Sequence, residues 1–139
     1  QLRQEAGLKH TTDEIEWFRQ WVDKVEPRMT QPTIVYNYPS WQAAMATHRN
    51  GYADRFEVYL AGMEIANCFA EEGDANVLRQ RFEESQSRRI AANKAPHPTD
   101  ERLLESTPLM PRTAGIAMGL DRLVMALSGE HNIAEVQVR

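Results

Sequence analysis

The chain has 139 residues, of which 42% are hydrophobic and 26% are charged, as in an average soluble globular protein. The formal net charge of −4 argues against a large nucleic-acid surface, because phosphate binding needs a basic face. Cys68 is the single cysteine, so no intrachain disulfide is possible, which fits a reducing cytoplasm. We expect no membrane helix, because no apolar run approaches ~18 residues, and no secretory signal in the polar residues 1–12.

The first expected element is a helix that starts at Thr12 and Asp13, which are good helix-capping residues. Pro27 is expected to end it. Apolar residues at helical spacing predict one buried face. Its members are Ile15, Phe18, Trp21, Val22 and Val25.

Strand signals follow this helix. Residues 33–38 are β-branched and aromatic and lie between two prolines, which predicts a strand, and residues 41–50 are expected to be irregular or a short helix. Residues 55–60 alternate in polarity and predict a second strand. Ala61 and Gly62 are a plausible two-residue turn, after which residues 63–67 would return antiparallel.

The second half of the chain is expected to be mainly helical. Asp74 opens a long polar helix to about Asn93, with a narrow buried edge and a solvated charged face. After a loop, residues 99–106 predict a short helix, and residues 114–118 predict a strand followed by a helix from Gly119 to Gly129. The buried edge comprises Leu78, Phe82 and Ser85, and the charged residues are Arg79, Arg81, Glu83, Glu84, Arg88 and Arg89. The order of elements predicts an α+β fold, an antiparallel sheet with helices on one side.

Two acidic residues are candidates for binding a cation. If Ala61 and Gly62 form the turn, Tyr59 lies opposite Glu64, and Glu57 shares a face with Glu64 at roughly 7–8 Å between backbone positions. Two carboxylates at this separation repel each other unless something positive lies between them. A Mg²⁺ ion bound to nucleotide phosphates can do this, although paired surface acids are also common.

A glycine-framed strand precedes the last predicted helix. Gly115 and Gly119 permit close approach of a ligand to the backbone. Arg122 falls in the first turn of the helix, where backbone N–H groups also favour an anion. The alternative reading is a packed turn in which Asp121 or Arg122 forms a salt bridge.

Together these two segments resemble a known family. Residues 115–123, Gly-Ile-Ala-Met-Gly-Leu-Asp-Arg-Leu, resemble motif 3 of class II aminoacyl-tRNA synthetases, and residues 55–71 resemble the lysyl, aspartyl and asparaginyl subgroup. Glu64-Ile65-Ala66-Asn67 is similar to the lysyl type. The resemblance covers about residues 31–138. It implies the C-terminal part of a class II catalytic core, with residues 1–30 as a helical lead-in and residues 31–139 holding the sheet, the helices and motif 3.

The resemblance implies roles for individual residues. Arg122 would bind the γ-phosphate of ATP, and Arg122 and Glu64 would be the catalytic pair. Glu57 and Glu64 would hold Mg²⁺ on the phosphates. Glu71 would pair with the side-chain ammonium of a lysine-like substrate. The remaining assignments are Gly115 and Gly119 beside the adenosine, Asn67 positioning the amino acid, Phe69 on its aliphatic stem and Ala117 in the pocket wall.

Ala117 separates the two closest groups within this family. Lysyl-tRNA synthetases usually carry Gly there, whereas ligases that attach β-lysine to elongation factor P carry Ala. The resemblance therefore favours a cytoplasmic, ATP-dependent ligase for β-lysine whose parent is a homodimer. The alternatives are a lysyl-tRNA synthetase fragment that charges tRNA, and a non-catalytic module that binds lysine or ATP.

The resemblance leads to two further expectations. A regular strand would put Asn67 on the opposite face from Glu64, so its role requires the chain to bulge or leave the strand at residues 65–67. In addition, no segment resembles motif 1 or motif 2, which in the family build the dimer interface and contact the α-phosphate. We therefore expect the 139-residue chain alone to be inactive in adenylate formation.

Overall fold

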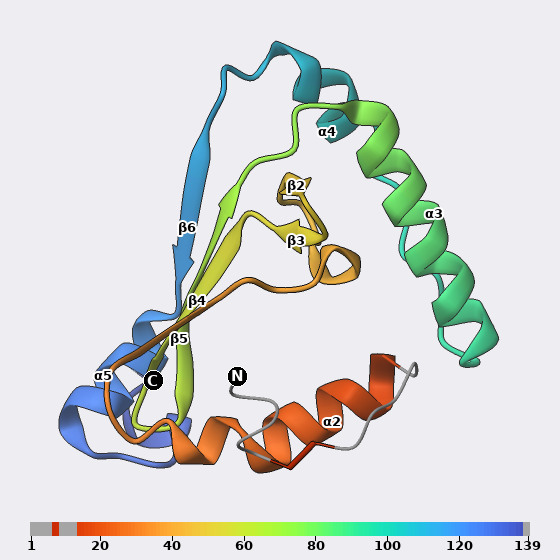
Figure 1. Ribbon diagram of the computed structural model, residues 1–139. Helices are drawn as coiled ribbons and strands as arrows, with labels where there is room; N and C mark the ends of the chain where they lie inside the picture. Colours follow the sequence, from red (N-terminus) through yellow and green to blue (C-terminus); the bar gives the residue numbers. More distant parts are fainter. Residues whose placement is uncertain (1–6, 9–13, 138–139) are drawn as a thin grey trace. The chain divides into compact units, whose positions relative to one another are not determined.

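The computed structural model describes residues 7–8 and 14–137 (Figure 1). Helix α2 (Glu14–Lys24) is followed by a 3-10 turn, η1 (Glu26–Arg28), with Pro27 in its first turn. Proline is tolerated at the start of a helix but not inside one, so the predicted end of the helix is confirmed. The predicted start at Thr12 and Asp13 lies outside the described residues.

The buried face of α2 differs from the predicted one. Ile15 and Phe18 are 54% and 59% exposed, although both were expected to be buried. Trp17 and Trp21, one helical turn apart, stack with their ring centroids 5.3 Å apart. Indole rings are large apolar groups, and both are buried on the inward face of the helix. The buried residues of α2 and its end are Trp17, Gln20, Trp21 and Val25.

The main sheet contains β1 (Thr33–Tyr36), β4 (Arg55–Leu60), β5 (Met63–Ala70) and β6 (Ala114–Met118), in the order β1-β4-β5-β6 within the described part of the chain (Figure 1). β1 runs antiparallel to β4, with Thr33 opposite Tyr59. This order leaves β1 and β6 as the edge strands.

Backbone conformation determines where these strands begin and end. β1 ends two residues earlier than predicted because Asn37 adopts a positive φ of 60°, which asparagine tolerates better than most residues. Ala61 and Gly62 have φ values of 50° and 76°, as in the two-residue turns that match strand twist. The predicted turn between β4 and β5 is confirmed, and β5 extends three residues beyond the predicted strand.

A second, smaller sheet was not predicted. Strands β2 (His48–Arg49) and β3 (Tyr52–Ala53) pair antiparallel, after a 3-10 turn, η2 (Ser40–Gln42). The connecting Asn50 and Gly51 have φ values of 52° and 81°. Asn-Gly is the strongest short-range hairpin signal. Strands of two residues are, however, too short to show the alternation of polar and apolar residues by which a strand is recognised in a sequence.

Helix α3 (Ala75–Ala91) confirms the long helix, with Asp74 accepting a hydrogen bond from the Asn76 N–H at 2.8 Å as the N-cap. Leu78 is its buried residue, whereas Ser85 is exposed, contrary to expectation. Arg81 also departs from the predicted solvated face. Its Nη1 donates to the carbonyl oxygens of Ala44 and Ala46, at 2.9 and 2.8 Å. Ala46 is buried, and a buried carbonyl group needs a donor, which Arg81 supplies.

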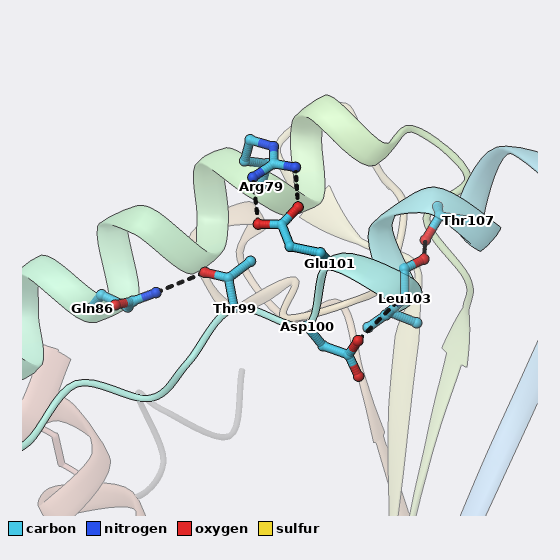
Figure 2. Close-up of polar contacts among 7 residues, drawn as sticks. All are labelled: Arg79, Gln86, Thr99, Asp100, Glu101, Leu103 and Thr107. Atoms are coloured by element: carbon cyan, nitrogen blue, oxygen red, sulfur yellow. Dashed lines mark hydrogen bonds and ion pairs between the residues drawn. The ribbon is translucent and has the colours of Figure 1, made fainter.

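The predicted short helix is α4 (Glu101–Ser106), followed by the 3-10 turn η3 (Thr107–Leu109). Figure 2 shows how it is attached to α3: the guanidinium of Arg79 forms two hydrogen bonds with the Glu101 carboxylate, at 3.0 and 2.6 Å. Gln86 donates to Thr99 at 2.9 Å, and Asp100 caps α4 by accepting from the Leu103 N–H.

The last elements are α5 (Leu120–Ser128) and the 3-10 turn η4 (Ile133–Glu135). Gly119 is the N-cap of α5, and Gly129 ends the helix in the left-handed conformation, with φ of 76°. Glycine adopts this conformation without a Cβ penalty. The predicted strand and helix of this region are confirmed.

The chain folds as two compact units. The first comprises Gln1–Tyr36, Phe56–Asn67 and Ile116–Arg139, and the second comprises Asn37–Arg55 and Cys68–Gly115. Strands β4, β5 and β6 pass from one unit to the other. The fold is α+β, as predicted, and no helix in the described ranges is long and apolar enough to cross a membrane.

Candidate active site

The predicted site residues are divided between the two units, and each group is described by itself. The first unit contains most of the residues assigned to the nucleotide and its metal ion, and the second contains those assigned to the substrate amine. The first group is Glu57, Glu64, Asn67, Ala117, Gly119 and Arg122, and the second is Phe69, Glu71 and Gly115.

Arg122 and Glu64 are in contact in the first unit. Arg122 lies in the first turn of α5, and its Nη1 donates to the backbone carbonyl of Glu64 at 3.0 Å. The same nitrogen lies 3.9 Å from Glu64 Oε2, and both side chains retain solvent access. A partly exposed arginine that contacts a carboxylate can exchange it for a phosphate, because the donors of the guanidinium group suit the oxygens of either anion.

Glu57 is the more buried of the two predicted metal-binding carboxylates, with 8% exposure. Its Oε2 accepts a hydrogen bond of 2.7 Å from the hydroxyl of Tyr59, which is 1% exposed. The Tyr59 oxygen in turn accepts from the indole N–H of Trp21 at 3.3 Å. The carboxylate is thus held in the interior by a hydrogen bond, as a buried charged group requires.

Glu26 is a third carboxylate in this region, and sequence reasoning did not find it. Its Oε1 lies 3.4 Å from the Tyr59 hydroxyl. Burial raises the pKa of Glu26, and the negative charges of Glu64 and Glu57 raise it further, while Tyr59 and Arg122 act in the opposite direction. Glu57, Glu64 and Arg122 therefore all lie within electrostatic reach of Glu26.

The donor chemistry of this cluster fits Mg²⁺. Among the described residues, no group of three or more His, Cys, Asp or Glu side chains is arranged to hold a metal ion. Mg²⁺ is ordinarily bound through one or two carboxylates together with substrate phosphates and water, rather than by an all-protein cage. Two glutamates, Glu57 and Glu64, provide the hard oxygen ligands that such an arrangement needs.

Gly119 and Ala117 lie at the junction of β6 and α5. The Gly119 N–H donates to the Ile65 carbonyl at 2.9 Å. A Cβ on Gly119 would meet the Arg122 side chain at 3.6 to 3.7 Å, an ordinary van der Waals contact. The Arg122 side chain therefore lies beside Gly119, and the place of Gly119 beside the adenosine stays a prediction. Ala117 is exposed.

Asn67 lies in an uninterrupted strand. β5 continues from Met63 to Ala70, so the chain does not leave the strand at residues 65–67. Ile65 and Ala66 are consecutive residues and are both buried, each with 3% exposure. This differs from a regular half-buried strand, in which alternate residues are buried. The role of Asn67 stays a prediction, and the function proposed below does not depend on it.

Glu71 and Gly115 are in contact in the second unit. A Cβ on Gly115 would lie 2.8 Å from Glu71 Oε1, so the carboxylate occupies the space that a side chain there would need. The Glu71 N–H donates to the Thr113 carbonyl at 3.0 Å. Burial raises the pKa of Glu71, because water no longer stabilises the ionised carboxylate as well. An ammonium group is the natural partner for such a carboxylate.

Phe69 is held by a cation–π contact. The Arg55 guanidinium carbon lies 5.2 Å from the centre of the Phe69 ring and 4.4 Å from the centre of the Tyr38 ring. Arg55 Nη1 also donates to the Gln42 carbonyl at 2.9 Å. The orientation of Phe69 is therefore determined by residues of the second unit far from it in the sequence.

Sequence reasoning missed Trp21, Glu26, Tyr59 and Arg55. Tyr59 could have been found, because it lies two residues after Glu57 and so on the same face of the strand. Trp21 and Glu26 belong to a segment more than thirty residues away, and no local pattern connects them to Glu57. Only the tertiary structure brings them together.

The chain thus has an α+β fold in which an arginine, Arg122, lies in the first turn of the helix that follows a glycine-framed strand. The sequence model of the family "tRNA synthetases class II (D, K and N)" matches residues 5–138. The chain therefore belongs to this family. Its members are ligases that use ATP and Mg²⁺ to activate an amino acid, so the predicted class II synthetase resemblance is confirmed at the level of the family.

Proposed function

We propose that the chain supplies the ATP, Mg²⁺ and amine-binding part of a ligase that activates a lysine-type amino acid as its adenylate. β-Lysine is the proposed amino acid, and a lysine of elongation factor P is the proposed acceptor. The contact of Arg122 with Glu64 is the observation that carries the proposal. It joins the arginine of the motif 3 segment to one of the two carboxylates proposed to hold Mg²⁺.

At the nucleotide end, Arg122 would exchange its contact with Glu64 for the γ-phosphate of ATP. Glu64, released from the arginine, and Glu57 would hold Mg²⁺ on the phosphates, and the ion would neutralise the negative charge that develops there. The first turn of α5 adds backbone N–H groups that favour an anion. Gly119, beside the Arg122 side chain, would leave room for the adenosine.

At the amine end, Glu71 would accept the side-chain ammonium of the substrate. The burial that raises its pKa disfavours the ionised form unless a positive charge is present, so the site favours a cationic ligand over a neutral one. Phe69 would pack on the aliphatic stem. Ala117, in the first unit, is the residue proposed to favour β-lysine over α-lysine.

A lysyl-tRNA synthetase fragment that charges tRNA is the alternative within the family, and a lysine- or ATP-binding module without catalysis is the alternative outside enzymes. Ala117 and the net charge of −4 favour transfer to a protein. We propose a cytoplasmic location and a homodimeric parent. A protein that carries this chain together with motifs 1 and 2, offered elongation factor P or tRNA with labelled amino acid, would show which acceptor is used.

Nucleotide binding is tested directly on the 139-residue chain by calorimetric titration with ATP and Mg²⁺. We expect binding in the wild type and at least about a tenfold loss in Arg122→Ala, since a charge-assisted bidentate contact contributes about 1.5–3 kcal/mol. Arg102→Ala is the matched control, because Arg102 is an exposed arginine of α4. Equal affinities in the two variants would contradict the proposed role of Arg122.

Catalysis is tested by ATP–pyrophosphate exchange with lysine and with (R)-β-lysine. We expect no measurable exchange from this chain alone, because no segment resembling motif 2 is available to contact the α-phosphate. Exchange at a rate typical of synthetases would refute that expectation. It would then show that the residues of the chain complete the site by themselves.

A further inference from the structure

We propose that Tyr59 is a positioning residue that holds Glu57 in the orientation required to bind Mg²⁺, and that α2 belongs to the site through Trp21. The inference rests on the proposed function, in which Glu57 is a metal ligand. It adds residues that the family resemblance does not assign. All of them lie in the first unit.

In the hydrogen bond between Tyr59 and Glu57, the tyrosine hydroxyl is the donor and the carboxylate is the acceptor. The Tyr59 hydroxyl carries one proton, and the shorter of its two carboxylate contacts is to Glu57 Oε2, at 2.7 Å against 3.4 Å to Glu26. The proton is therefore donated to Glu57. The indole N–H of Trp21 donates to the same hydroxyl oxygen at 3.3 Å, so the hydroxyl cannot rotate without losing one of the two bonds.

The support behind the hydroxyl is rigid. Trp21 stacks on Trp17 at an interplanar angle of 12° and is buried. The segment after α2 is attached to the β4–β5 turn, where the Gly62 N–H donates to the Met29 carbonyl at 3.0 Å. A Cβ on Gly62 would lie 3.4 Å from the Glu26 carbonyl oxygen, so the two segments are in close contact. Trp21 is thus fixed relative to β4.

A carboxylate that binds a metal ion is commonly hydrogen-bonded by a second residue, which fixes its orientation. Tyr59 meets this description for Glu57. The two side chains lie on the same face of β4, two residues apart, so the bond needs no distortion of the strand. Without the hydroxyl, the buried carboxylate loses the 2.7 Å hydrogen bond from Tyr59, while the tyrosine ring still fills the core.

The inference is tested with Tyr59→Phe, which removes only the hydroxyl. Tyr36→Phe is the control, because the side chain of Tyr36 in β1 is exposed. The first measurement is the Mg²⁺ concentration at the midpoint of ATP binding to the full chain. We expect the midpoint to rise about 10- to 100-fold in Tyr59→Phe, the usual effect of removing a hydrogen-bond partner of a metal ligand. We expect Tyr36→Phe to match the wild type.

The second measurement needs no metal. The carboxyl ¹³C resonance of Glu57, assigned by its loss in Glu57→Gln, should shift and broaden in Tyr59→Phe as the side chain samples several orientations. An unchanged Glu57 resonance, or an unchanged Mg²⁺ midpoint in a folded Tyr59→Phe, overturns the positioning role. Wild-type ATP binding that does not respond to Mg²⁺ instead overturns the metal site on which the inference rests.

Discussion

The surroundings of Glu71 indicate the charge of the ligand that this residue would bind. It is a partly buried carboxylate, its carboxylate oxygen occupies the space beside Gly115, and its raised pKa comes from burial alone. A carboxylate of this kind is costly when ionised, and an incoming ammonium group would remove the cost. Because its pKa is raised, Glu71 is also expected to affect how the free energy of unfolding depends on pH.

Glu71→Gln is expected to be more stable than the wild type at neutral pH. The pKa of Glu71 is higher in the folded protein than its ordinary value of 4.5. Glu71 therefore contributes stability to the wild type below pH 4.5, where it is protonated. That contribution is lost as the pH rises through the folded-state pKa. Urea denaturation at several pH values should therefore show the two proteins converging in acid. A constant difference across pH would contradict this account.

Gly115→Ala is expected to displace the Glu71 carboxylate. The new Cβ would lie 2.8 Å from Oε1, and the end of a flexible side chain can move at little cost. We expect the melting temperature to change by a few degrees at most, whereas the pKa of Glu71, followed by NMR, returns toward 4.5 as the carboxylate moves toward water. A large loss of stability would show instead that Glu71 cannot move.

At the scale of elements, α3 depends on its ends and on Arg81 more than on apolar packing. Leu78 is its buried residue, so the helix buries little surface of its own. Asp74 caps the first turn, and Arg81 connects the helix to the carbonyl groups of Ala44 and Ala46.

Asp74→Ala is expected to destabilise the chain by about 1 kcal/mol, the usual cost of removing an N-cap. Asp74→Ser should recover most of the loss, because the serine hydroxyl can also accept from the Asn76 N–H. Guanidinium denaturation of the three proteins measures both effects. If Ser and Ala were equally destabilising, the carboxylate charge at the helix start, rather than the cap, would be the stabilising feature.

At the scale of the whole molecule, the first unit exposes a continuous apolar stripe on α5. Leu120, Val124 and Leu127 follow one another at helical spacing, and Leu120 and Leu127 are 70% and 76% exposed. The edge strand β6 also exposes Ile116 and Met118. Apolar surface on a helix next to an unprotected edge strand promotes association.

Leu120→Lys and Leu127→Lys are each expected to lower the binding of a hydrophobic fluorescent dye and to raise solubility. Stability should change by less than about 0.5 kcal/mol, as for most exposed positions. Leu104→Lys is the contrasting variant, because Leu104 is buried at 3% and its replacement should unfold the second unit. Dye binding that persists in both surface variants would place the exposed apolar surface elsewhere.

The amino-acid sequence by itself determined the elements and the family. The turn at Ala61 and Gly62, the cap at Asp74 and the strand–helix junction at Gly119 depend on backbone preferences of residues adjacent in the chain, which are readable locally. The expectation that Glu57 and Glu64 share a face of the sheet rests on strand periodicity and one turn, and it stays a prediction. The resemblance of residues 55–71 and 115–123 indicated the class II synthetase family, which the family comparison confirms.

Only the tertiary structure decided which face of α2 is buried, and that Trp21 and Glu26 lie beside the Glu57–Tyr59 pair. The physical reason is that packing selects among several apolar faces of similar size, and here the stacked indoles outweigh Ile15 and Phe18. Contacts such as Trp21 to Tyr59 join residues 38 positions apart. No periodicity along the chain encodes such a contact, because it depends on how the elements pack.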